Sequence, residues 1–336
     1  MTGMTRTPGH GRRATLSGAL ALAGALTLAA CSSGPGSGSS PGSGGVGTDA
    51  KAGATHTVKT AMGAVQVPGA PKRVVVLDTA ELDSVITLGV KPVGATRAGA
   101  ASDFLGYLPK NQVTGVKNVG EIGNPNLETV AALKPDLILT NKVRDEARYG
   151  QLSAIAPTVM TETTGYPWKQ NFRVHAEALG RLPEARKAER AYRKQVADVT
   201  EAVGGRRKAA ATSVNIVRFV EGADIRIYGQ KTCIATILGD VGLGRPAITE
   251  KAKDGWSYDV SPEKIDLADA DVIFHATYGD PRKAKATEVL DSGLWKRLPA
   301  VKNHRVTGVD DELWIQGIGY TAAGKILAEL ESGLTR

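Results

Sequence analysis

The segment PEARKAERAYRKQVADVTEAV, residues 183–203, predicts one long helix around which the rest of the chain can be interpreted. Pro183 suits the first turn of a helix, Glu184 follows where the helix dipole favours an anion, and no other glycine or proline occurs before Gly204. Apolar residues recur at spacings of three and four in a narrow stripe, which comprises Ala185, Ala188, Tyr192, Val196, Val199 and Val203. A core helix would have a broader apolar face, so we expect this helix to lie across two domains and to touch each along one edge.

The sequences on either side of this helix resemble each other. NLETVAALKPDLILT (126–140) aligns without a gap with SPEKIDLADADVIFH (261–275), which matches Glu128 with Glu263 and Asp136 with Asp271. Two equivalent α/β lobes joined by the helix are the simplest architecture. The alternative is chance similarity between short helix-to-strand units, which α/β folds reuse.

The amino-terminal residues predict export and a lipid anchor. A basic segment ending in Arg13 precedes an uncharged apolar run that ends at Cys31, so residues 1–30 are predicted to be a signal peptide. Leu28-Ala29-Ala30-Cys31 resembles the bacterial lipoprotein box, in which the cysteine is lipidated; an ordinary cleaved signal with a stray cysteine is the alternative. Export could use the general route or, because Arg12 and Arg13 are adjacent, the twin-arginine route. Residues 31–56, rich in glycine, serine and proline, are predicted to be a disordered tether.

The remaining chain divides into a first lobe at 57–182, the interlobe helix at 183–204 and a second lobe at 205–336. Residues 73–78 are a β-branched run without alternation, which is typical of a strand buried on both faces of a parallel sheet. A capped helix at 79–89 follows, but the turn between them lacks the glycine fingerprint of a dinucleotide site. The second aligned segment, residues 261–275, predicts a helix from Ser261 and a strand at 271–275.

Motifs for catalysis and for nucleic-acid binding are absent. The formal net charge is +8, but no dense cluster of lysine and arginine occurs, so no nucleic-acid partner is expected. HExxH, CxxC and GxSxG do not occur, and GYTAAGKI at 319–326 lacks the hydroxyl residue that ends a phosphate loop. Of the two cysteines, Cys233 is expected to be a buried thiol. We therefore expect a binding protein with no enzymatic activity, no cofactor and no bare-metal site.

Aromatic and arginine residues gather at predicted loops and strand ends. In open α/β sheets ligands bind outside the carboxyl ends of the strands, so two facing lobes would line a cleft with such side chains. The predicted ligand-binding residues are Arg97, Arg144, Trp168, Arg218, Tyr228, Trp256, Tyr258, Tyr278 and Trp314.

Four segments carry a family resemblance: RVVVLDTAELDSVITLGVKPVGAT, NVGEIGNPNLETVAALKPDLIL, SPEKIDLADADVIF and LWKRLPAVKNHRVTGVDDELWIQGIGYTAAGKIL. Over residues 72–330 the chain resembles the periplasmic-binding-protein family that serves iron-siderophore and vitamin B12 importers. The resemblance implies an α/β fold of the class III type, in which two Rossmann-like lobes with central parallel sheets are bridged by one long helix. It also implies an iron chelate held between the lobes of a monomeric protein anchored outside the cell membrane.

The resemblance assigns further roles. Glu128 and Glu263 match the family's surface glutamates that dock on arginines of the ABC permease, although carboxylates in a first helical turn also complement the helix dipole. Trp256 stands where related hydroxamate binders place an aromatic ring against the ligand.

A ferric hydroxamate siderophore is the predicted ligand. Neutral or weakly cationic chelates suit aromatics with a few arginine donors, whereas strongly negative tris-catecholates call for a denser basic cluster. Other iron chelates, cobalamin or haem are alternatives, as is a sensor lipoprotein without transport. The missing phosphate loops disfavour a Rossmann enzyme or an ATPase.

Overall fold

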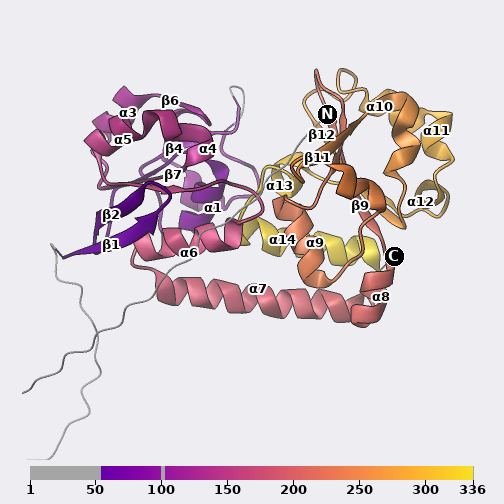
Figure 1. Cartoon of the computed structure of the whole chain (residues 1–336), viewed down its shortest axis with the longest axis horizontal. Coiled ribbons are helices and arrows are strands. Elements are labelled where there is room, and N and C mark those ends of the chain that lie inside the picture. Colours follow the sequence, from indigo (N-terminus) through magenta and orange to yellow (C-terminus); the bar gives the residue numbers. More distant parts are fainter. Residues whose placement is uncertain (1–53, 100–102, 336) are drawn as a thin grey trace, which may run out of the picture. The chain divides into compact units, whose positions relative to one another are not determined.

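Two β-sheets, each flanked by helices, organise residues 54–99 and 103–335, which a computed structural model describes (Figure 1). The predicted signal peptide, Cys31 and residues 31–53 of the predicted tether lie outside the described residues. None of the helices in the described ranges has both the length and the apolar composition needed to cross a membrane.

The first sheet contains the predicted βαβ start. Its strand order is β6-β5-β4-β3-β7-β8, and all neighbours are parallel except β5 and β6. Residues 74–76 are completely buried, as the unbroken β-branched run predicts. The strands are β3 (Val74–Val76), β4 (Gly94–Arg97), β5 (Lys117–Glu121), β6 (Asn124–Pro125), β7 (Leu137–Asn141) and β8 (Thr158–Thr161). A separate antiparallel hairpin, β1 (Thr55–Thr60) and β2 (Gly63–Pro68), precedes the sheet.

The helices that accompany the first sheet include short segments at the carboxyl ends of its strands. They are α1 (Thr79–Thr87), α2 (Lys110–Val113), α3 (Leu127–Ala132), α4 (Lys142–Asp145), η1 (Glu146–Arg148), α5 (Tyr149–Ile155) and α6 (Trp168–Ala178). The Asp78 side chain accepts from the backbone N–H of Thr79 and so caps α1.

The second sheet is mixed, with the order β11-β10-β9-β12-β13. Strands β9, β12 and β13 are parallel, whereas β10 is antiparallel to β9 and β11 is antiparallel to β10. The predicted parallel arrangement therefore holds for β9, β12 and β13, while β10 and β11 extend the sheet as antiparallel strands. The strands are β9 (Val214–Val220), β10 (Ile225–Tyr228), β11 (Ser257–Val260), β12 (Val272–Tyr278) and β13 (Val306–Gly308).

The helices that accompany the second sheet include two of the 3₁₀ type. They are α8 (Gly205–Ala211), α9 (Cys233–Val241), η2 (Ala247–Lys251), η3 (Pro262–Ala268), α10 (Ala286–Asp291), α11 (Gly293–Lys296), α12 (Pro299–Lys302), α13 (Asp311–Trp314) and α14 (Tyr320–Leu334). The predicted helix from Ser261 is thus the 3₁₀ helix η3, and its backbone is non-helical at Lys264. A helix is therefore present where the repeat predicts one, but it is of a different type from its counterpart α3.

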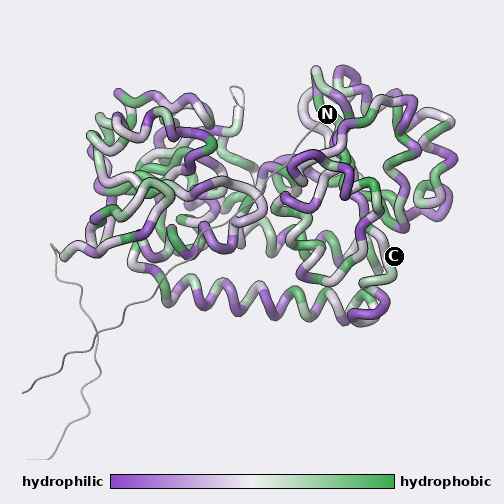
Figure 2. The backbone as a smooth tube through the Cα atoms, in the orientation of Figure 1, coloured by the Kyte–Doolittle hydropathy of each residue, from purple (hydrophilic) through white to green (hydrophobic). Residues whose placement is uncertain are grey.

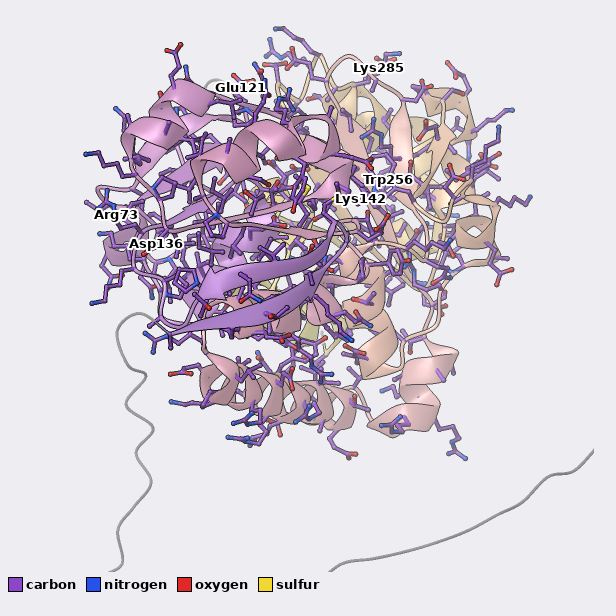
Figure 3. The ribbon with its side chains drawn as sticks, turned by 60° about the vertical axis from the view of Figure 1, so that its left-hand side comes forward. Arg73, Glu121, Asp136, Lys142, Trp256 and Lys285 are labelled. Carbon is purple, nitrogen blue, oxygen red and sulfur yellow. The ribbon has the colours of Figure 1, made fainter. Side chains whose placement is uncertain are left out.

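The two halves of the chain also share one kind of hydrogen bond, made where the chain enters β3 and β9. Asp136 accepts hydrogen bonds from the backbone N–H groups of Lys72 and Arg73, both at 2.8 Å, where the chain enters β3 (Figure 3). Asp271 accepts from the backbone N–H of Ser213 at 2.7 Å, where the chain enters β9. The two aspartates that align in the sequence therefore hold the same kind of strand pair, β3 with β7 and β9 with β12.

The predicted long helix is α7 (Leu182–Ala202). It contacts α6, which precedes it in the sequence, and α8, α9 and α14, which follow it. Hydrophilic residues recur along its length (Figure 2). Its buried side chains form the narrow inner stripe, where Tyr192 packs edge-on against Trp168 and Tyr320. The boundaries 57–182, 183–204 and 205–336 remain predictions, because α14 also contacts α1.

A buried carboxylate joins α1 to α14. Asp83 is fully buried and accepts from the backbone N–H groups of Thr321 and Ala322, each at 3.0 Å, at the first turn of α14. It also accepts from the hydroxyl groups of Tyr107 at 3.0 Å and Thr87 at 3.1 Å. Since α14 has no capping side chain of its own, Asp83 serves as its N-terminal cap from a distant part of the sequence.

Candidate ligand-binding site

A cavity of about 660 Å³ lies between the carboxyl ends of strands from both sheets. From the first sheet it is lined by residues that directly follow β3, β4, β7 and β8, including Thr79, Ala98, Arg144 and Thr163. From the second half it is lined by side chains of β9, β10 and β12 and by residues 314–316 and 318. This is the position at which open α/β sheets bind ligands, and the volume suits a small organic molecule or chelate.

Six of the nine predicted ligand-binding residues line this cavity, namely Arg144, Arg218, Tyr228, Trp256, Tyr278 and Trp314. Arg97 ends β4, and its neighbour Ala98 contributes to the lining. Two aromatic predictions lie elsewhere. Trp168 is only 2% exposed and donates its indole N–H to Thr236 at 2.8 Å, while Tyr258 packs from β11 against the core of the second sheet. Neither ring reaches the cavity.

The wall of the cavity formed by the second half of the chain contains a bidentate ion pair. Arg218 on β9 donates from Nε and Nη2 to the two carboxylate oxygens of Asp311, both at 2.6 Å. Its Nη1 donates to the Tyr228 hydroxyl at 3.3 Å, and its guanidinium lies 4.9 Å from the centre of the Tyr278 ring. Because its donors are engaged and it is 8% exposed, Arg218 holds two aromatic side chains in place and has little capacity left for a ligand.

The sequence interpretation missed Arg226, which is the cross-strand partner of Arg218. The two arginines lie opposite each other on adjacent strands, and both line the cavity. Like charges in this arrangement are unfavourable unless an anion offsets them, and here Asp311 offsets the charge of Arg218 alone. The guanidinium of Arg226 lies 5.0 Å from the centre of the Trp256 ring, whose side chain is 47% exposed. In the sequence Arg226 stands between Ile225 and Ile227, and this alternation indicates that its side chain lies on the opposite face of the strand from theirs.

The wall of the cavity formed by the first half of the chain contains a second arginine–aspartate pair. In this pair only one of the arginine nitrogens contacts the carboxylate. Arg144 donates from Nε to Asp78 Oδ2 at 3.0 Å, and its side chain is 40% exposed. No hydrogen bond from its two terminal nitrogens occurs within residues 54–99 and 103–335. Those nitrogens are therefore available to a ligand.

Cations dominate the charged lining of the cavity. Arg144, Arg218, Arg226 and Lys231 line it, and Asp78 is the one carboxylate among its described lining residues. Lys231, which precedes α9, was also missed by the sequence interpretation.

The cavity lining also includes the predicted buried thiol. Cys233 is 6% exposed, and burial, reinforced by the negative charge of Asp83, raises the pKa of its thiol to about 12. The thiol therefore stays protonated and inert near neutral pH. Within the described ranges, no group of three His, Cys, Asp or Glu side chains converges in a geometry that could hold a metal ion.

The two glutamates predicted to dock on a permease are both exposed. Glu128 lies in the first turn of α3, and Glu263 lies in the first turn of η3. A hydrogen bond from Ser261 lowers the pKa of Glu263, so this carboxylate is ionised at neutral pH. Both side chains are free to meet a partner surface.

The model of the periplasmic binding protein family matches residues 74–313. The chain belongs to that family, which comprises non-enzymatic transport binding proteins. It is 37% identical over 295 residues to the probable siderophore-binding lipoprotein YfiY of Bacillus subtilis (strain 168), with 85% of this chain and 89% of the relative covered. It is 31% identical to the iron(3+)-hydroxamate-binding protein FhuD of the same organism, with 79% of this chain and 82% of the relative covered.

Solved structures share the two-lobe α/β fold. Staphylococcus aureus SirA complexed with staphyloferrin B is 35% identical in sequence and superposes with a TM-score of 0.74, with 83% of this chain and 98% of SirA covered.

Proposed function

We propose that this periplasmic binding protein captures a ferric siderophore in the cavity between its two sheets and delivers it to an ABC permease. The observation that carries the proposal is the cavity itself, in which aromatic rings alternate with cationic side chains. Relatives that are named for siderophore binding match most of its length.

The charges of the cavity favour an anionic chelate. Arg226 and Lys231 have no carboxylate partner within the described ranges, and the terminal nitrogens of Arg144 are available as well. Because Asp311 already pairs with Arg218, the cations that gain most from a negatively charged ligand are Arg226, Lys231 and Arg144. The hydroxamate prediction rested on few arginine donors, and the structure shows a denser cationic lining. We therefore place an anionic ferric chelate ahead of a neutral hydroxamate.

The aromatic side chains would supply the apolar contact area. Trp256 is the most exposed of the predicted aromatic residues that line the cavity, and Tyr278 follows at 41%. Trp314 is 1% exposed and stacks on Phe274, so it forms part of the floor rather than a movable contact. Binding of a chelate against Trp256 and Tyr278 would cover surface that is otherwise unusually exposed for aromatic residues.

Two further elements complete the proposed function. Glu128 and Glu263, exposed in corresponding units of the repeat, would engage arginines of the permease. Diacyl modification of Cys31 would hold the protein at the outer face of the cell membrane, since a single chain anchors only marginally.

The proposal is tested by titrating the purified protein with ferric staphyloferrin B, ferric citrate and ferric desferrioxamine B while tryptophan emission is recorded. We expect saturable quenching, with the anionic chelates binding more tightly than the cationic hydroxamate chelate and losing affinity as salt increases. Arg226→Gln should weaken binding of the anionic chelates by about tenfold, the loss of one charge-assisted contact. The matched control is Arg282→Gln, which removes an exposed arginine that does not line the cavity.

One outcome would refute the proposal, and a second would change only the class of chelate. Absence of binding by all ferric chelates would refute capture of a siderophore. Tight, salt-independent binding of the hydroxamate chelate alone would support capture but restore the hydroxamate prediction.

A further inference from the structure

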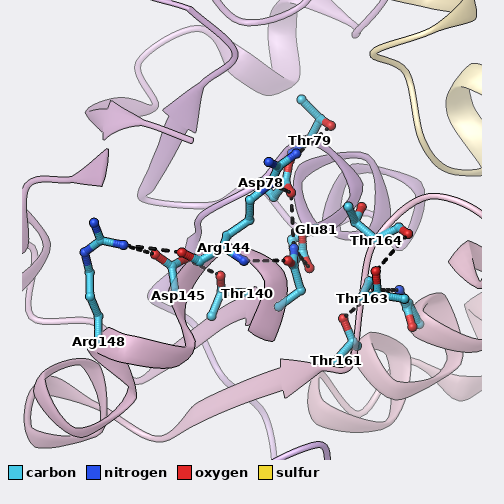
Figure 4. Close-up of polar contacts among 12 residues, drawn as sticks. Asp78, Thr79, Glu81, Thr140, Arg144, Asp145, Arg148, Thr161, Thr163 and Thr164 are labelled. Carbon is cyan, nitrogen blue, oxygen red and sulfur yellow. Dashed lines mark hydrogen bonds and ion pairs between the residues drawn. The ribbon is translucent and has the colours of Figure 1, made fainter. Parts of the chain in front are cut away.

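Two buried carboxylates lie one behind the other at the first-half wall of the cavity (Figure 4). Asp78 lines the cavity, whereas Glu81, three residues later in α1, is fully buried behind it. The side-chain amide of Asn141 donates to both of them, to Asp78 Oδ2 at 3.1 Å and to Glu81 Oε1 at 3.3 Å. A single donor therefore bridges the two carboxylates.

Among the described residues, one cation contacts this pair. The Nε of Arg144 donates to Asp78 Oδ2, which is the oxygen that Asn141 also contacts. Glu81 has no cationic partner within the described residues, and its Oε2 atom has no hydrogen-bond partner there. Two negative charges on the pair would thus be offset by one guanidinium, which burial makes unfavourable.

The other titratable groups around Glu81 do not supply the missing charge. His175 of α6 places Nε2 3.8 Å from Glu81 Oε1, but burial lowers the pKa of His175 to about 3, so the ring is neutral. Its Nδ1 is 2.9 Å from the Ser84 hydroxyl oxygen. Asp145 of α4 is a third buried carboxylate and is paired with Arg148 at 3.2 Å.

The cluster therefore favours a proton on Glu81. Burial, followed by the negative charge of Asp78, raises the pKa of Glu81 to about 8. An aspartate at the N-cap with a glutamate three residues later is also a familiar capping arrangement. In that arrangement the glutamate returns to the N-cap backbone N–H, whereas Glu81 accepts a hydrogen bond from Asn141 on another element.

We propose that Glu81 is a positioning residue for the ligand site, because the proton it holds keeps Arg144 available to an anionic ligand. This inference rests on the proposed function, in which the ligand is an anionic ferric chelate. When Glu81 loses its proton, a second negative charge behind Arg144 attracts the guanidinium and repels the ligand. Binding of an anion at Arg144 consequently favours protonated Glu81, and proton uptake accompanies binding wherever Glu81 is partly ionised.

The direction of the pH dependence follows. Affinity for an anionic chelate is highest below the pKa of Glu81 and falls as the pH rises through it. A coupling of about 0.5 to 1 pKa unit between ligand and carboxylate corresponds to a loss of about threefold to tenfold. A carboxylate with a purely structural role would leave the affinity independent of pH in this range.

The experiment uses the full-length protein with ferric staphyloferrin B as the probe and tryptophan emission as the readout, from about pH 6.5 to about pH 9.5. The ratio of wild-type to variant affinity is compared at each pH, because protonation of the chelate then cancels. Glu81→Gln keeps the size of the side chain and an acceptor for Asn141. We expect it to bind like the wild type at the acidic end and about threefold to tenfold more tightly at the alkaline end.

Asp145→Asn is the matched control, since it neutralises a buried carboxylate in the same cluster that pairs with Arg148 rather than Arg144. It should retain a pH dependence of the same size as that of the wild type, with a midpoint at slightly lower pH because the charge of Asp145 also contributes to the raised pKa of Glu81. Calorimetry in buffers of different ionisation enthalpy should show uptake of a fraction of a proton by the wild type near about pH 8 and less by Glu81→Gln. Identical pH profiles for the wild type and Glu81→Gln would overturn the inference.

A second measurement follows the titration of Glu81 itself and requires neither a ligand nor a variant. The carboxyl carbon resonance of Glu81 should titrate near about pH 8 in the ligand-free protein, and titration near about pH 4 would overturn the inference. If the wild type bound none of the ferric chelates at any pH, the proposed function would fail. The titration of Glu81 would still decide whether this carboxylate holds a proton near neutral pH.

Discussion

Replacement of Asp83 should separate α14 from α1 and destabilise the whole fold. In Asp83→Ala the backbone N–H groups of Thr321 and Ala322 and the hydroxyl of Tyr107 lose their common acceptor. The Thr87 hydroxyl keeps Thr321 Oγ1 as a partner at 2.7 Å. Loss of a helix cap costs about 1 kcal/mol, and each buried donor left unpaired costs about 1 to 3 kcal/mol.

The carboxylate also has an unfavourable contribution that offsets part of this loss. Burial raises the pKa of Asp83 despite the hydrogen bonds from Thr321, Ala322, Tyr107 and Thr87, so the ionised side chain is costly to bury. We therefore expect Asp83→Ala to lower the free energy of unfolding by about 3 kcal/mol rather than by the full sum. For a chain of this size that loss corresponds to a fall in Tm of about 5 to 10 °C.

The pH dependence has a defined sign. Because the folded-state pKa of Asp83 is raised, its contribution to stability is most favourable below the unfolded-state pKa and is lost as the pH rises through the folded-state value. Asp83→Asn should remove this contribution and, because an amide presents an N–H to one of the donors, cost about 1 to 2 kcal/mol near neutral pH.

Thermal and urea unfolding followed by circular dichroism measure these differences. The control is Asp259→Ala, which removes an exposed carboxylate on β11 and should change stability by no more than about 0.5 kcal/mol. A Tm for Asp83→Ala equal to that of the wild type would refute the idea that this carboxylate holds α14.

The remaining predictions concern binding, docking and anchoring. Trp256→Ala should weaken binding of ferric staphyloferrin B by about 1 to 3 kcal/mol in fluorescence titrations without lowering Tm, and unchanged affinity would exclude this ring from the site. Arg218→Ala should instead lower the free energy of unfolding by about 3 to 5 kcal/mol in urea titrations, because its buried carboxylate partner is left unpaired; an unchanged unfolding midpoint would contradict this account. Reversal of both Glu128 and Glu263 to lysine should abolish uptake of radioactive ferric chelate by cells while leaving affinity in solution unchanged, and normal uptake would remove the docking role. Cys31→Ala should release most of the protein into the medium, as immunoblots of membrane and medium fractions would show, and retention in the membrane would contradict the lipid anchor.

Local sequence patterns were sufficient for most individual elements. The unbroken apolar run of β3, the capped helix α1 and the sparse apolar stripe of α7 follow from side-chain periodicity and capping, which act over a few residues. The alignment of Asp136 with Asp271 identified two residues that make the same kind of contact in the two sheets. The helix η3 departs from its counterpart α3 although the two sequences align, because similar short sequences can form either a 3₁₀ or an α turn.

The candidate site depended on contacts that local patterns do not contain. Trp168 and Trp256 both follow a turn residue, Pro167 and Gly255, yet the first ring is packed in the interior and the second is half exposed in the cavity. Which way each ring faces is decided by its neighbours in space. Helices α7 and α14 pack against the first ring and strand β10 against the second, and all three elements lie elsewhere in the sequence.

What the sequence by itself determined is the identity of most strands and helices, the long helix and the likeness of the two halves, because these follow from short-range periodicity. Only the tertiary structure decided which polar groups meet. Arg218 and Asp311 are 93 residues apart, and Asn141 and Glu81 are 60 residues apart. Such contacts determine whether the donors of an arginine are already paired or are available to a ligand. They also determine whether a carboxylate keeps its proton, since charge state depends on burial and on neighbours in space.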